Sequence, residues 1–284
     1  MNSPSQSPVA TSGRQIVSWL TVLQVLSVVS AVAYVVLALL GRSQAGVQVS
    51  RTVDLSIGGL QVLLSVLWVL AIQVMKRWMT DVRHWATGDG APNAERTDRD
   101  ARTLRGWLLA GQLLPILAAF VIVPLTWYAI GIGLDTAEFQ DQLRRQSGGQ
   151  NLPPETLRAA VQLGSVLTLV FFVVPSIAIN WAVLGWVRRW TRGVTDAVAG
   201  RPLGEPRLAD VAGTLARWFT FFQALLVLVI LMVLAVPLVG LPQETGLDRV
   251  SLVVYFLLLS LQVALLQWSK TFLAGVTQRA AGVR

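Results

Sequence analysis

The fold is decided by residues 16–40, IVSWLTVLQVLSVVSAVAYVVLALL, an apolar stretch that contains no Asp, Glu, Lys, Arg or His. At about 1.5 Å of rise per residue, a helix of this length crosses about 30 Å of hydrocarbon. The triplet Ala31-Val32-Ala33 resembles a signal cleavage site, but the apolar stretch continues beyond it to Leu40. We therefore expect a retained transmembrane helix and not a secretory signal.

Five more apolar stretches of similar length follow, and none of them contains a charged residue or His. They are residues 55–75, 107–134, 159–187, 218–241 and 250–269. Open strands would leave backbone groups unsatisfied in lipid, so all six stretches are expected to be helices. Charged residues make up only 13% of the chain, against about 25% in soluble proteins. The sequence thus predicts an all-α polytopic membrane protein with six transmembrane helices.

Basic residues predict the orientation of the spans. Of the 23 Lys and Arg residues, 17 lie on the side of the N-terminus, the second and fourth connections and the C-terminus, and 6 lie on the other side. The positive-inside rule then places both termini in the cytoplasm. The predominance of Arg over Lys suggests a bacterial protein, hence the bacterial inner membrane. The net charge of +8 is expected to meet anionic lipid headgroups and not nucleic acid.

Two sequence patterns recur three times in the same order. The odd-numbered spans begin with W-x4-Q, and the even-numbered spans end with [KR]-[RT]-[WF]-x3-V-x5-G. The first pattern occurs at residues 19–24, 107–112 and 218–223, and the second at residues 76–88, 188–200 and 270–282. Recurrence of both patterns predicts three copies of one helical hairpin.

The repeats define the expected domain organisation. Hairpin repeats occupy residues 14–88, 105–200 and 217–284, and two cytoplasmic linkers occupy residues 89–104 and 201–216. Residues 1–13 are polar, contain Pro and Ser and lack periodicity, so a disordered tail is expected there.

Each repeat is expected to end in a short cytoplasmic helix that lies flat in the headgroup layer. Trp78, Val82 and Trp85 recur at i, i+4 and i+7, which places them on one helical face. Trp78, Trp190 and Phe272 would anchor these interfacial helices, and the final Gly of each pattern would stop them. The alternative is that these residues simply continue the preceding span into water.

Amide side chains are expected to form a polar layer about 7.5 Å deeper in the membrane than the Trp of each W-x4-Q pattern. The layer comprises Gln24, Gln112, Gln223, Asn180 and Gln262, whereas the equivalent position of the second span is Trp68. One hypothesis is that these amides hold the spans together by hydrogen bonds. The other is that they line a solute path on a pseudo-threefold axis.

The chain contains no catalytic, metal-binding or nucleotide-binding motif. It has no Cys, its one His is His84 in a basic segment outside the spans, and it lacks a phosphate-binding loop. We therefore expect a non-enzymatic protein without cofactor or metal, which scaffolds other membrane components or serves as their partner subunit. The alternative is a small-solute permease or channel that uses the amide layer.

Overall fold

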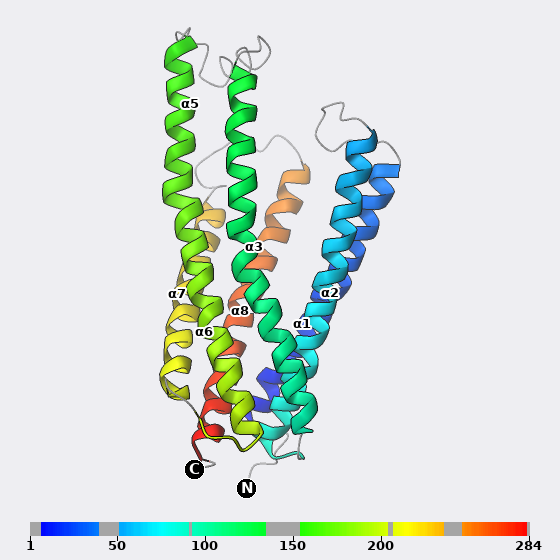
Figure 1. Ribbon diagram of the computed structural model, residues 1–284, viewed down its shortest axis with the longest axis vertical. Helices are drawn as coiled ribbons and strands as arrows, with labels where there is room; N and C mark the ends of the chain where they lie inside the picture. Colours follow the sequence, from blue (N-terminus) through cyan, green and yellow to red (C-terminus); the bar gives the residue numbers. More distant parts are fainter. Residues whose placement is uncertain are drawn as a thin grey trace. The chain divides into compact units, whose positions relative to one another are not determined.

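The computed structural model describes residues 7–39, 51–90, 93–134, 154–203, 207–235 and 246–282, and these residues are helical apart from short turns (Figure 1). The chain forms two compact units. The first contains Met1–Arg105 and Arg188–Arg284, and the second contains Gly106–Val187. Residues 1–6, Leu40 and residues 236–241, which belong to the predicted tail and spans, lie outside the described residues.

The first unit is built around two helical hairpins. One pairs α1 with α2, the other pairs α7 with α8, and α1 also packs against α8. The first turns of α3 and the last turns of α6 complete this unit. The helices are α1 (Pro8–Leu39), α2 (Arg51–Thr87), α3 (Ala94–Leu134), α6 (Val174–Val198), α7 (Leu208–Ala235) and α8 (Gly246–Gly282).

The second unit contains the remainder of α3, helix α5 (Pro154–Thr168), the π-helical turn η2 (Leu169–Val173) and the first turns of α6. Pro175 stands two residues after the end of η2. A proline cannot donate to the carbonyl four residues earlier and its ring crowds that carbonyl, so the wider turn accommodates it within a helix that otherwise continues.

Glycines stop two of the helices as the sequence predicts. Gly88 and Gly200 have φ of +76° and +65°, a left-handed conformation that is strained for residues with a side chain. The following N–H groups, of Asp89 and Arg201, donate to the carbonyls of His84 and Asp196 at 3.1 and 2.8 Å. This pattern satisfies carbonyls that the helix end leaves open. Helix α8 ends at the third predicted glycine, Gly282.

Six helices in the described residues are long and apolar enough to cross a membrane, which confirms the six-span prediction by length and composition. Between 0% and 28% of each apolar window is buried inside the protein. Large aliphatic and aromatic side chains such as Phe120, Phe172 and Met232 are more than 60% exposed. Exposure of this kind is stable only in lipid, so the chain is a multi-pass membrane protein in contact with the bilayer.

The predicted disordered tail is wrong from Pro8 onward, because helix α1 begins there. The Ser7 hydroxyl accepts the Ala10 N–H at 3.1 Å and caps the helix, and Ala10 and Ser12 are buried. Burial against the rest of the first unit stabilises this turn in spite of its polar composition. Helices α3 and α7 begin likewise at Ala94 and Leu208, so much of each predicted linker is helical.

The predicted interfacial helices are not separate elements. Helices α2, α6 and α8 continue without a break to Thr87, Val198 and Gly282. No Gly or Pro separates the end of each apolar stretch from its basic segment, so nothing in the sequence interrupts the helix there. The alternative, that these residues continue the span, therefore describes the helix bounds correctly.

Candidate functional site

Gln24 joins the two helices of the first hairpin. Its Nε2 donates to the Val69 carbonyl at 3.1 Å and to Gln73 Oε1 at 3.3 Å. Its Oε1 accepts a hydrogen bond from Lys76 Nζ at 3.0 Å. Both N–H donors of the amide and one side of its oxygen are thus engaged within the hairpin.

Gln223 makes the same three contacts in the α7–α8 hairpin. Its Nε2 donates to the Val263 carbonyl at 3.1 Å and to Gln267 Oε1 at 3.3 Å, and its Oε1 accepts from Lys270 Nζ at 3.1 Å. Lys76 and Lys270 are the only two lysines in the chain, and they occupy the same position of the repeated pattern. We call each set of Gln, Gln and Lys a polar clip.

In the second unit, the amides join α3 to α6 with a different set of partners. Gln112 Nε2 donates to the Trp181 carbonyl at 2.7 Å, and Asn180 Nδ2 donates to the Gly111 carbonyl at 3.0 Å. Gly185 occupies the position of Gln73 and Gln267, and a Cβ there would lie 3.2 Å from Gln112 Nε2. The small residue leaves room for an amide that is only 2% exposed.

The hydrogen bonds described above for four amides each join the two helices of one hairpin: Gln24, Gln112, Gln223 and Asn180. Gln262 is exposed on α8. Hydrogen bonds of this kind between spans contribute about 0.6–2 kcal/mol each. The polar layer as a solute path stays a prediction.

The aromatic residues that were expected to anchor interfacial helices form instead a buried cluster in the first unit. Trp78, Trp190 and Phe272 are 2%, 6% and 2% exposed. The Trp190 ring contacts Trp78 and Phe272 edge to face, with centroids 5.8 and 6.5 Å apart. Valines lie one turn further along each helix and are completely buried: Val82, Val194 and Val276. Protein, and not the headgroup layer, surrounds this aromatic cluster.

Each indole N–H group of the aromatic cluster donates to a threonine on the next helix in the order α2, α6, α8. Trp78 Nε1 donates to Thr195 Oγ1 on α6, and Trp190 Nε1 donates to Thr277 Oγ1 on α8, each at 3.3 Å. In the third such pair, Phe272 of α8 has no N–H donor, and Arg83 of α2 occupies the position that corresponds to Thr195 and Thr277. Gly13 packs here, since a Cβ on it would lie 3.0 Å from Arg83 Cδ and 3.1 Å from Phe272 Cε2.

A second set of contacts also starts from helices α2, α6 and α8. The sequence did not predict it. Thr97 Oγ1 of α3 donates to Asp81 Oδ2 of α2 at 3.5 Å. A Cβ on Gly193 of α6 would lie 2.8 Å from Leu208 Cδ1 of α7, and a Cβ on Gly275 of α8 would overlap Val9 of α1. Asp81, Gly193 and Gly275 each stand three residues after the aromatic residue of their pattern. Each junction therefore joins the end of one hairpin to the start of the next, and we call the three together the junction ring.

Ion pairs surround the same end of the first unit. Arg201 bonds Asp98 and Asp196 at 2.8 and 2.9 Å. The hydrogen bond to Asp98 raises the pKa of the Arg201 guanidinium, which favours its charged form. Arg77 lies 3.7 Å from the buried carboxylate of Asp100. These pairs tie α3 to α2 and to the end of α6.

The contacts described above are packing contacts, hydrogen bonds and ion pairs. Among the residues that the structure describes, no three His, Cys, Asp or Glu side chains lie close enough to hold a metal ion. His84 Nε2 lies 2.7 Å from Arg83 Nη2. Comparisons of the chain with protein-family models, curated proteins and solved structures gave no match.

Proposed function

We propose that the chain is a non-enzymatic protein of the bacterial inner membrane that scaffolds other membrane components. The observation that carries the proposal is the engagement of the span amides within their own hairpins, as in the two polar clips. Hydrogen-bonding capacity used in this way holds helices together and is not directed at a solute. The apolar outer surfaces of the spans then remain to contact lipid and the spans of partner proteins.

A triplicated hairpin is the architecture that we propose behind this function. In all three hairpins the Gln of W-x4-Q donates to the carbonyl nine residues before the aromatic residue of the second pattern: Val69, Trp181 and Val263. The junction ring runs from the first repeat to the second, from the second to the third and from the third to the first. These contacts lead from the end of each repeat to the start of the next and return to the first repeat after the third. Such head-to-tail contacts support a pseudo-threefold origin.

Affinity purification of the tagged protein from its native membranes tests the scaffold function. We expect a stoichiometric membrane-protein partner that remains bound in mild detergent. A chain that purifies alone and mediates solute flux in proteoliposomes would instead support the permease.

Replacement of Gln223 with Leu distinguishes a packing role of the amides from a solute path. The variant removes the bonds to the Val263 carbonyl, Gln267 and Lys270 at similar side-chain volume. If the amide only joins helices, we expect a loss of about 1 kcal/mol or less in unfolding free energy and no change in solute flux. Thermal melting in detergent and flux in proteoliposomes measure the two quantities. Flux abolished at unchanged melting temperature would refute the scaffold proposal, and Q24L serves as the matched variant.

The proposed orientation predicts which positions are labelled from each side of the membrane. Single cysteines at Gly90, Pro202 and Arg284 should react only from the cytoplasm, and those at Gly46, Gly148 and Gly246 only from the opposite side. The absence of native Cys makes each signal unambiguous. Gly46, Gly148 and Arg284 lie outside the described residues. Cytoplasmic labelling at Gly148 would contradict the six-span topology.

A further inference from the structure

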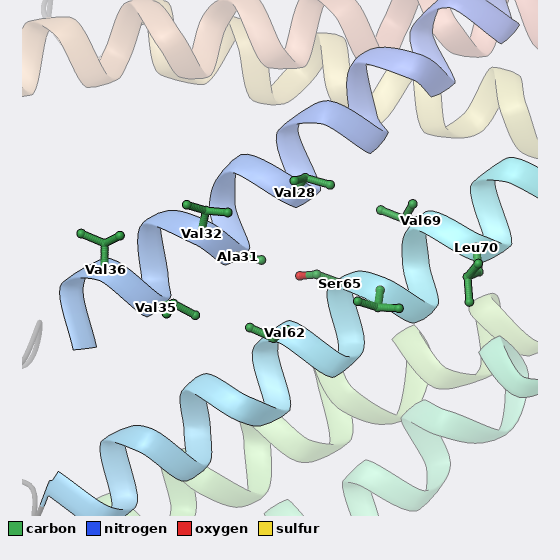
Figure 2. Close-up of a pocket in the computed structure, with 10 residues that line it drawn as sticks. Val28, Ala31, Val32, Val35, Val36, Val62, Ser65, Val69 and Leu70 are labelled. Atoms are coloured by element: carbon green, nitrogen blue, oxygen red, sulfur yellow. The ribbon is translucent and has the colours of Figure 1, made fainter. Parts of the chain in front are cut away.

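An apolar groove of about 440 Å³ lies in the crease between α1 and α2 (Figure 2). Ala31 and Ser65 form its floor and are each 8% exposed, and Figure 2 shows them facing one another across the two helices. Its walls are aliphatic and open outward, since Val32 and Val66 are 57% and 51% exposed. Both helices are candidate membrane spans, so the groove opens to hydrocarbon.

The first polar clip lies beyond one end of the groove, between the same two helices. On α1, Gln24, Val28 and Ala31 recur at i, i+4 and i+7, which places them on one helical face. On α2, Lys76 follows Val69, which lines the groove, by seven residues, or close to two full turns and about 10.5 Å along the axis. The ammonium group has three N–H donors and gives one to Gln24 Oε1. A cation thus stands in line with an aliphatic groove, at the basic end of the span.

The third hairpin has the same polar clip but larger side chains along the equivalent stripe. Ile230 and Leu259 occupy the positions of Ala31 and Ser65, and Phe256 occupies the position of Val62. The groove between α1 and α2 therefore arises from small side chains and not from the clip.

We propose that this groove holds one acyl chain of an anionic phospholipid, with the lipid phosphate at Lys76. An aliphatic lining with a single hydroxyl offers nothing to orient a polar or aromatic ligand, whereas a hydrocarbon chain matches it. A helix about 10 Å wide would enter a groove of this volume only with one edge. The charge of Lys76 complements the phosphate and selects anionic headgroups over neutral ones. This inference does not depend on the scaffold function.

Native mass spectrometry of the full-length protein in detergent tests the site, with phosphatidylglycerol and phosphatidylcholine of matched chains as probes. We expect one phosphatidylglycerol retained per chain. Lys76→Gln keeps a donor for Gln24 and should weaken phosphatidylglycerol binding about fivefold, the contribution of one basic residue near an anionic surface. Lys270→Gln, in the hairpin with larger side chains, is the matched control and should leave binding unchanged. Equal weakening by both variants would overturn the proposal.

Two further variants test the groove itself. A31I/S65L introduces the residues of the third hairpin and should abolish retention of the lipid. Val32→Phe covers the groove from an exposed wall without touching its floor, so it decides the matter if the double variant does not fold. Retention of phosphatidylglycerol by folded V32F, or occupation of the groove by a protein segment or a second copy in crosslinking, would refute a lipid site.

Discussion

Replacement of Trp190 with Ala is expected to lower the free energy of unfolding by about 3–5 kcal/mol, the loss typical of a buried aromatic side chain. Trp190 is the central ring of the aromatic cluster, because it contacts both Trp78 and Phe272. Its indole also bonds Thr277, so the truncation opens a cavity and leaves that hydroxyl without its donor. Equilibrium unfolding in mixed micelles measures the loss.

The matched variant Trp190→Phe keeps most of the ring packing and removes the hydrogen bond. It retains an aromatic ring, as Phe272 supplies at the third occurrence of the pattern, and it removes the indole donor together with part of the ring volume. We expect a cost of about 1 kcal/mol for that bond. Equal stability of W190A and the native chain would mean that the cluster does not hold the first unit together.

Replacement of Gly275 with Val should destabilise the protein by about 2–3 kcal/mol, because a Cβ at this position would overlap the Val9 side chain. Truncation of the neighbour in the double variant V9A/G275V should recover a large part of the loss. A double-mutant cycle on unfolding free energies gives the coupling between the two positions.

Gly213 on the exposed face of α7 provides the control for the glycine variant. A Cβ there meets nothing within 4 Å, so Gly213→Val should be neutral or mildly stabilising through helix propensity. If G275V and G213V have the same effect, the contact between α8 and the start of α1 contributes nothing to the fold. Additive effects in V9A/G275V would lead to the same conclusion.

The sequence could suggest the hydrogen bonds within each hairpin, because the two helices that they join are consecutive in the chain. The six apolar stretches fix the spans, and the five-residue spacing of W-x4-Q turns each Gln away from its Trp by about 140°. Gln24 and Gln223 therefore reach the neighbouring helix of their own hairpins, with Val69 and Val263 as acceptors. The shared polar layer stays a prediction, because a helix face does not specify which helix it meets.

The sequence by itself determined the membrane class, the helical spans, the glycine stops at Gly88 and Gly200 and the correspondence between Lys76 and Lys270. Only the tertiary structure decided where the aromatic cluster lies. The same amphipathic face of Trp78 and Val82 can bury against headgroups or against protein, since both environments remove apolar surface from water. Contacts between residues far apart in the chain, such as Trp78 with Thr195 and Gly275 with Val9, select burial in protein. No local periodicity encodes those pairs, because each joins helices that are far apart in the chain.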